Sequence, residues 1–171
     1  MIDEAYGAFS TRDHRDLRAR PNVATLGTLS KVGLAAARVG WAALPRGLAA
    51  EVDKVRQPYN LNALSQVVGE LALGPLAPSI EAACARVVDA RGALRDTLTQ
   101  IDGVTVSPSA ANFLWVELPR DAGEVHAALL ARGVVVRSFH ASGGRLARRL
   151  RVTVGTTDEN ARFVEALRAS L

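Results

Sequence analysis

A short apolar segment that leads straight into a lysine-bearing run is the feature that most constrains the fold. Residues 23–26 follow a Pro-Asn turn and are expected to form a short strand. Residues 28–41 come next, and small or apolar residues surround their few polar side chains. Gly33 and Gly40 allow the backbone of this run to come close to a ligand. Lys31 is therefore expected at the end of a strand, beside backbone that can approach a bound molecule.

Lys31 differs chemically from nearly every other cation in the chain. The 21 basic residues comprise 19 arginines and two lysines, Lys31 and Lys54. An amine can become a neutral nucleophile and form a Schiff base when its pKa is lowered, which a guanidinium cannot do. Ser30 adds a hydroxyl directly before this amine, and Arg38 adds a guanidinium seven residues after it. We interpret the run as a site for an anion and a carbonyl compound.

Length and composition are those of a globular protein with one or two domains. The chain has 171 residues, of which 49% are hydrophobic and 22% are charged, so disorder is not expected. The net charge is +4, yet the arginines are scattered, and their one tight run lies at residues 145–151. Aromatic residues do not alternate with that run, which argues against nucleic acid as a partner.

The single cysteine and the lengths of the apolar runs indicate the cellular compartment in which the protein is expected. One cysteine cannot form an internal disulfide, and it suits a reducing compartment. Cys84 lies on the apolar side of a helical pattern, where we expect a small buried residue rather than a nucleophile. No apolar run reaches the length of a membrane span, and the start lacks the pattern of a signal peptide. The sequence predicts a cytoplasmic protein without a membrane partner.

The first part of the chain is expected to mix short strands with helices. The expected elements are a charged helix or loop at 13–20, strands at 23–26 and 38–44, a helix opened by residues 45–47, and a helix at 62–73. Residues 74–78 then bring together a glycine and two prolines, and they are the best candidate for a hinge. A first domain of residues 1–78 follows from this break.

The second part is expected to be a separate α+β domain covering residues 79–171. A long helix is predicted at 79–99, with Ser79 as its N-cap. The other expected elements are strands at 104–106, 112–118, 134–136 and 150–154, and helices at 121–131 and 157–170. Thr157 and Asn160 are expected to start the last helix, because acidic residues lie in its first turn. Trp41 and Trp115 lie in strand patterns and are expected in the core.

Six motifs occur in the order found in a known enzyme family. They are Asp-Glu-Ala-Tyr at residues 3–6, Thr-Leu-Ser-Lys at 28–31, Arg-Val-Gly-Trp at 38–41, Lys-Val-Arg-Gln-Pro-Tyr-Asn at 54–60, Ala-Asn-Phe-Leu at 111–114 and Leu-Arg-Val-Thr-Val-Gly-Thr at 150–156. Together they resemble the C-terminal half of a fold-type I, class I and II aminotransferase that depends on pyridoxal 5'-phosphate. Within that family they are most similar to histidinol-phosphate aminotransferases. The ordered set is far more specific than any one motif.

The resemblance implies an α/β fold and a set of cofactor-binding residues. Residues 1–78 would be a partial large-domain sheet with helices, followed by the small C-terminal α+β domain. Lys31 would hold the cofactor as a Schiff base and act as general acid and base. Asp3 would pair with the pyridine nitrogen, and Tyr6 would hydrogen-bond the ring oxygen. Ser30 and Arg38 would bind the phosphate.

The resemblance also implies residues on the substrate side and a partner subunit. Arg151 corresponds to the arginine that holds the acidic group of the amino donor in this family. Arg137 resembles a second arginine near the substrate phosphate, and Asn112 resembles a residue that orients the substrate. Tyr59 resembles a residue that reaches the site of the partner subunit, which implies a homodimer.

Plainer readings of these residues stay open. Asp3 and Tyr6 lie at the start of the chain and could be terminal surface residues. Arg137 could be the solvated end of a strand rather than a ligand for substrate. The histidines lack the spacing for a metal site or a catalytic triad, although His140 lies close enough to Arg137 in sequence to be a substrate contact.

The implied reaction is amino transfer between L-histidinol phosphate and 2-oxoglutarate, a step of histidine biosynthesis. A full-length member of the family is about twice as long, and the resemblance implies that the Gly-rich turn, the ring that stacks on the cofactor and an asparagine lie in the part not present here. One alternative is a non-catalytic fragment of which residues 79–171 fold well. Another is a related enzyme that depends on the same cofactor and acts on another amino acid, such as a threonine-phosphate decarboxylase or an aromatic aminotransferase.

Overall fold

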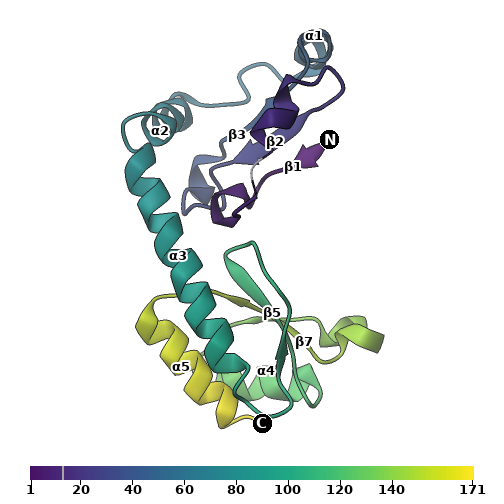
Figure 1. The fold of residues 1–171 in the computed structure, drawn as a ribbon, viewed down its shortest axis with the longest axis vertical. Helices are drawn as coiled ribbons and strands as arrows, with labels where there is room; N and C mark the ends of the chain where they lie inside the picture. Colours follow the sequence, from purple (N-terminus) through teal and green to yellow (C-terminus); the bar gives the residue numbers. More distant parts are fainter. Residues whose placement is uncertain (13) are drawn as a thin grey trace. The chain divides into compact units, whose positions relative to one another are not determined.

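The chain folds into two compact units, Met1–Ala85 and Arg86–Leu171. The computed structural model describes residues 1–12 and 14–171, so one position of the charged segment expected at 13–20 lies outside the described residues. Helix α3 (Ala77–Leu98) contributes residues to both units (Figure 1). The domain boundary expected after residue 78 stays a prediction.

The first unit is built on a three-stranded sheet in the order β1-β2-β3. Its strands are β1 (Ile2–Asp3), β2 (Thr25–Thr28) and β3 (Gly40–Ala43), with β2 in the middle (Figure 1). Strands β1 and β2 run parallel, with Asp3 opposite Leu26, whereas β2 and β3 are antiparallel. The short 3₁₀ turns are η1 (Gly7–Phe9), η2 (Arg15–Ala19) and η3 (Ala35–Ala37), and the helices are α1 (Arg46–Val55) and α2 (Ala63–Leu73).

The core of the first unit is small. Leu29, Val39 and Ala72 are buried together, and Ile80 is among the partly buried residues that pack on them. Helix α2 begins as predicted, because the side chain of Asn62 accepts a hydrogen bond from the Ser65 amide at 2.9 Å. Helix α1 buries no residue, and its apolar positions are all exposed, namely Leu48, Val52 and Val55.

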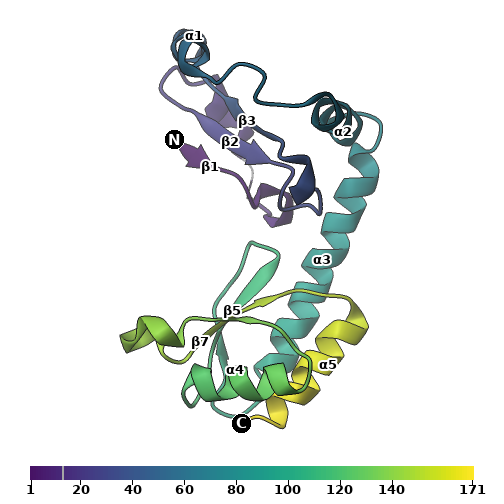
Figure 2. The same ribbon diagram turned by 180° about the vertical axis from the view of Figure 1, so that it is seen from behind.

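The second unit is an antiparallel four-stranded sheet with helices on one of its faces. The strands are β4 (Thr105–Val106), β5 (Phe113–Glu117), β6 (Arg137–Ser138) and β7 (Arg149–Thr153), in the order β4-β5-β7-β6. Helices α4 (Ala122–Ala131) and α5 (Thr157–Arg168) lie beside the sheet (Figure 2), and two 3₁₀ turns are η4 (His140–Ser142) and η5 (Gly144–Leu146).

Alternation along the two central strands separates a buried face from a more open one. Leu114 and Val116 of β5 and Leu150 and Val152 of β7 are at most 2% exposed, and they pack against residues of α3, α4 and α5. The residues between them point to the other face, because successive side chains of a strand alternate. That other face therefore carries Arg151 beside the aromatic residues of β5.

The segment expected as a strand at 134–136 is not one. The amide of Val134 donates to Leu129 O at the end of α4, and the carbonyl of Val136 lies 3.1 Å from His126 Nε2. Pairing with β7 begins only at Arg137, which lies opposite Arg151. The valine-rich composition favours a strand. The backbone groups of Val134 and Val136 instead contact residues of α4, so they do not pair with a neighbouring strand.

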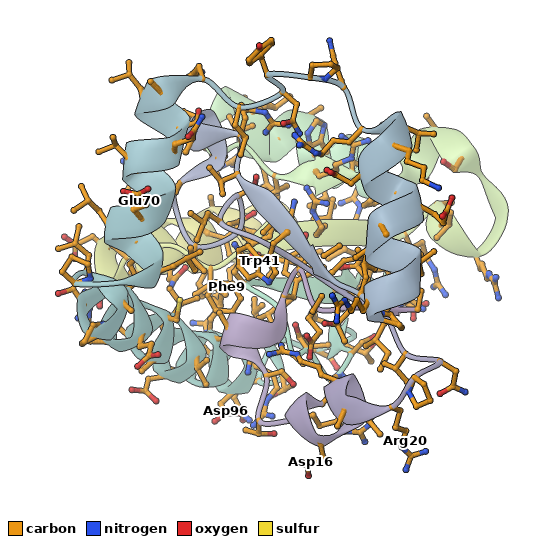
Figure 3. The ribbon with its side chains drawn as sticks, turned by 90° about the horizontal axis from the view of Figure 1, so that it is seen from above. Phe9, Asp16, Arg20, Trp41, Glu70 and Asp96 are labelled. Atoms are coloured by element: carbon orange, nitrogen blue, oxygen red, sulfur yellow. The ribbon has the colours of Figure 1, made fainter. Side chains whose placement is uncertain are left out.

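Three other details also correct the sequence-based expectations. Helix α3 begins at Ala77 rather than at Ser79, because Pro78 fits the first turn, where its missing amide is not needed. Helix α5 is capped by Thr156 and Glu159 in a capping box, instead of Thr157 and Asn160. Trp41 of β3, which is labelled in Figure 3, is not a core residue, because 42% of its surface is exposed.

No single helix in the described part of the chain is long and apolar enough to cross a membrane. Helices α2 and α3 satisfy the length and composition only as a pair, which is bent by 74° at the break between them.

Candidate functional site

The parallel pair of strands in the first unit places Asp3 and Lys31 beyond the same edge. Asp3 is the last residue of β1, and Lys31 follows the end of β2 by three residues. Because parallel strands end at the same edge of a sheet, both side chains leave the sheet on that side, where α/β proteins bind ligands. The Oδ1 atom of Asp3 accepts a hydrogen bond from the Ala5 amide at 2.9 Å, which turns the chain towards Tyr6.

Lys31 and Tyr6 are brought together by this arrangement. The Nζ atom of Lys31 lies 5.3 Å from the centre of the Tyr6 ring, within the range of a cation–π contact, and both side chains are half-buried. Lys54 offers a contrast, because it is exposed on α1 and its Nζ pairs with Glu51 at 2.6 Å. Of the two lysines, Lys31 is therefore the one whose surroundings are suited to a site.

The turn that carries Lys31 is fixed by the hydroxyl of Thr28. Thr28 Oγ1 donates to the Val39 carbonyl and accepts from the Ser30 amide, each at 3.0 Å. The amide of buried Leu29 donates to the same carbonyl at 3.0 Å. These bonds tie the turn to the segment that leads into β3 and orient the backbone of Ser30. Sequence reasoning missed this role of Thr28, although a threonine two residues before Ser30 is a known turn signal.

Arg38 has an unusual backbone and a local partner. Its φ of +57° lies in the left-handed region, which is uncommon for a residue with a side chain and is concentrated at functional sites. Its Nη1 atom donates to the Ala35 carbonyl at 3.1 Å, and this is its only side-chain hydrogen bond in the described part of the chain. The structure thus leaves Arg38 exposed and turned to its own loop, and its role as a phosphate ligand stays a prediction.

Gly33 lies two residues after Lys31 in open surroundings. Its φ is +95°, which favours glycine, and nothing lies within 4 Å of the place where a Cβ would be. The surroundings of this glycine are therefore open to solvent.

A cluster missed by the sequence reasoning supports the segment between Asp3 and Tyr6. Arg18 Nη2 donates to Glu4 Oε2 at 2.7 Å, and His14 Nδ1 lies 3.6 Å from the other carboxylate oxygen of Glu4. The Glu4 amide in turn donates to the Leu26 carbonyl. Glu4 therefore connects η2 to the strand pair from which Asp3 and Lys31 project. A lone glutamate offers no sequence signal for such a contact.

The second unit brings two predicted substrate ligands together. Arg137 and Arg151 are direct partners across β6 and β7, and both line an opening of about 430 Å³ together with Ser138 and Thr153. The Arg151 guanidinium carbon lies 5.3 Å from the centre of the Phe113 ring, and that of Arg137 lies 5.6 Å from the Phe139 ring. Like charges placed opposite each other destabilise a sheet, so an anion between them would be favourable.

The remaining predicted residues are less closely grouped. Asn112 lies directly before β5, and its carbonyl accepts a hydrogen bond from the Val154 amide just after β7, at 3.0 Å. The Nδ1 atom of His140 lies 2.8 Å from Ser138 Oγ, so this imidazole borders the arginine pair only through a serine. Tyr59, in the first unit, is 99% exposed with a φ of +56°. The roles of Asn112 and Tyr59 stay predictions.

Few other groups in the described residues have distinctive chemistry. No three His, Cys, Asp or Glu side chains of the described part lie where they could hold a metal ion. Cys84 is buried as expected, and burial, with a smaller contribution from Glu81, raises the pKa of its thiol. A raised pKa keeps a thiol protonated, which fits a packing role rather than a nucleophile.

Comparisons with known proteins point to one family. A family model for aminotransferase class I and II matches residues 1–167. Histidinol-phosphate aminotransferase 2 of Burkholderia pseudomallei (strain 1710b) is 41% identical over 173 residues, which cover 100% of this chain and 48% of that protein. The chain thus spans about half the length of the curated relatives that it matches.

Solved structures agree with this result. Histidinol-phosphate aminotransferase from Sinorhizobium meliloti, in complex with pyridoxal-5'-phosphate, has a TM-score of 0.82 at 25% identity and covers 98% of this chain and 47% of its own. L-threonine-O-3-phosphate decarboxylase from Porphyromonas gingivalis has a TM-score of 0.85 at 21% identity, covering 98% and 53%, and shows similarity of fold alone. The family match and the 41% identity confirm the resemblance seen in the motifs: this protein belongs to the class I and II aminotransferases.

Proposed function

We propose that this chain binds pyridoxal 5'-phosphate through Lys31 and takes part in amino transfer. The observation that carries the proposal is the placement of Lys31 beyond the carboxyl edge of a parallel strand pair, next to Tyr6 and on the same edge as Asp3. The residues fit this cofactor, since they offer an amine for its aldehyde, a carboxylate for its ring nitrogen and a phenol for its ring oxygen.

Each of these residues has a definite chemical task in the proposal. Pyridoxal phosphate, when bound, supplies an aldehyde carbon and a ring that accepts electrons. The Lys31 amine would bind that carbon and move a proton at the α-carbon of the substrate. The Asp3 carboxylate would keep the ring nitrogen protonated. The Tyr6 hydroxyl would donate to the ring oxygen, and Ser30 and Arg38 would bind the phosphate.

The proposed reaction transfers the amino group of L-histidinol phosphate to 2-oxoglutarate. Support comes from the curated relatives with that name at about 40% identity over the whole chain. The pair Arg137 and Arg151 supports it as well, because both substrates carry acidic groups that a guanidinium binds well. The proposal extends to a place in histidine biosynthesis, in the cytoplasm, and to a homodimer in which exposed Tyr59 reaches a second copy.

The proposal can be tested with the two lysines, because they form a matched pair. Wild type, Lys31→Ala and Lys54→Ala are each mixed with pyridoxal phosphate, and the visible absorbance is recorded. We expect a band in wild type and in Lys54→Ala that is lost in Lys31→Ala, since Lys54 is an exposed residue paired with Glu51. A wild-type protein without the band, or a band that survives in Lys31→Ala, would contradict the proposal.

A second measurement addresses the amino donor. The wild-type protein with bound cofactor is mixed in turn with L-histidinol phosphate, L-tyrosine and L-threonine O-3-phosphate. The decay of the visible absorbance band and the products formed are measured. We expect the fastest decay with L-histidinol phosphate. Faster decay with another compound would contradict L-histidinol phosphate as the substrate, but it would not contradict the proposed binding of the cofactor.

A further inference from the structure

The loop that carries Asn112 is held from outside by Arg91, a residue of α3 that the family motifs do not include. Arg91 Nη1 donates to the carbonyl of Ala111 at 2.6 Å, and both residues belong to the second unit. Arg91 is half-buried, and burial, together with the charge of Arg95, lowers the pKa of its guanidinium. A charged donor in such a place makes a stronger hydrogen bond than a neutral one.

This bond fixes the orientation of Asn112 because the peptide unit is planar. The carbonyl of Ala111 and the amide of Asn112 belong to one rigid plane, so holding the oxygen also orients the amide. The next peptide plane is held as well, since the Asn112 carbonyl accepts from the Val154 amide at 3.0 Å. Both peptide planes that flank Asn112 are therefore held by partners outside the loop, and its Cα–Cβ direction follows from them.

Ser109 completes the support of the loop. Its Oγ donates to the Phe113 carbonyl at 2.6 Å and accepts from the Ala111 amide at 3.2 Å. The ring of Phe113 in turn lies beneath the Arg151 guanidinium. The loop therefore sets the position of Asn112 and also that of the ring on which Arg151 rests.

We propose that Arg91 is a positioning residue that preorganises Asn112 and Arg151 for an acidic substrate. The identity of the substrate in this proposal rests on the proposed function. The hydrogen bonds that hold the loop are observed independently of it. Preorganised side chains bind a ligand more tightly because less ordering is required on binding. Loss of Arg91 should thus weaken substrate binding without removing any group that touches the substrate.

The test compares Arg91→Met, Arg91→Lys and Arg86→Met in the full chain. Arg86→Met is the matched control, because Arg86 is an exposed arginine on the same helix. Hydrogen exchange of the Ala111 and Val154 amides is measured without ligand. We expect exchange on the order of tenfold faster in Arg91→Met than in the control, and an intermediate rate in Arg91→Lys, which keeps a charged donor. Exchange equal to that of Arg86→Met would overturn the proposal.

A titration with L-glutamate tests the consequence for substrate binding. The nuclear magnetic resonance signal of Asn112 is monitored as L-glutamate is added, and it gives the dissociation constant. The dissociation constant should rise on the order of tenfold in Arg91→Met and stay unchanged in Arg86→Met. An unchanged constant in Arg91→Met would overturn the positioning role. If wild type shows no response to glutamate, the proposed function fails on the substrate side, and the exchange rates still decide whether Arg91 holds the loop. If Arg91→Met does not fold, Arg91→Lys carries both comparisons.

Discussion

The two units differ in what supports their functional side chains. In the second unit, Arg151 and its neighbours stand on a sheet whose other face is covered by three helices and by an apolar core that includes Leu98, Leu129 and Leu150, each 0% exposed. In the first unit, Lys31 stands on a turn held by a few hydrogen bonds, above a small core around Leu29. The substrate-side residues thus stand on a sheet backed by a packed core, with hydrogen bonds adding support to the Asn112 loop, whereas the cofactor-side turn depends mainly on its own hydrogen bonds.

Removing a core leucine from each unit gives the largest effects and tests this contrast directly. Leu150→Ala should destabilise the second unit by about 2–5 kcal/mol, because Leu150 is fully enclosed and leaves a cavity. Leu29→Ala should cost less, about 2 kcal/mol, because only two other described residues of its cluster are buried and its partly exposed neighbours can relax into the space. Denaturant unfolding, with hydrogen exchange resolved along the chain, measures each unit separately. Equal costs in the two units would break the comparison.

The capping of α5 gives a smaller effect, confined to the second unit. Thr156→Ala should lower the free energy of unfolding by about 1 kcal/mol, since the hydroxyl accepts a hydrogen bond from the Glu159 amide at 3.3 Å. Thr157→Ala is the matched control and should cost less, because Thr157 lies inside the first turn and does not cap the helix. Thermal unfolding monitored by circular dichroism compares the two. A larger loss in Thr157→Ala would contradict the observed cap.

The smallest expected effect is a pH dependence of the stability that Glu159 contributes at the start of α5. Hydrogen bonds from the backbone and hydroxyl of Thr156 lower the pKa of Glu159 from its ordinary value of 4.5. A lowered pKa in the fold means that the ionised carboxylate stabilises the folded state above the unfolded pKa, and that this contribution is lost as the pH falls through the folded pKa. Wild type should therefore be more stable than Glu159→Gln at pH 7.

The difference should shrink once the pH is below about 4. Melting temperatures of the two proteins across this range provide the measurement. A difference that grows towards acidic pH would have the wrong sign and would exclude the proposed cause.

Much of the second unit could be predicted because its sequence pattern and its packing agree. The strands predicted at 112–118 and 150–154 correspond to β5 and β7, in which buried and partly exposed residues alternate. The strand predicted at 134–136 was wrong. The composition of a segment does not reveal that its backbone bonds to the end of α4 instead of to another strand. The cap at Thr156 was missed by one residue, although Thr156 and Glu159 have the spacing of a capping box.

The first unit was harder to predict, because long-range contacts decide its details. Gly27 lies opposite Trp41, and a Cβ at Gly27 would come within 2.3 Å of the indole ring. The ring therefore lies across the glycine and remains exposed instead of entering a core. At the candidate site, Lys31 and Asp3 were predicted from the motifs and their roles stay predictions, but the supporting contacts of Thr28 and Glu4 join segments that are distant in sequence.

The position of Trp41 over Gly27 has a practical consequence for spectroscopy. The chain has two tryptophans, and each unit contains one of them. Trp41 is partly in contact with solvent, whereas Trp115 is half-buried with its ring centre 4.7 Å from that of Phe139. Their indoles should therefore emit at different wavelengths, with Trp41 shifted to the red. Replacing either one by phenylalanine leaves a native fluorophore that reports on the other unit alone, without any attached label.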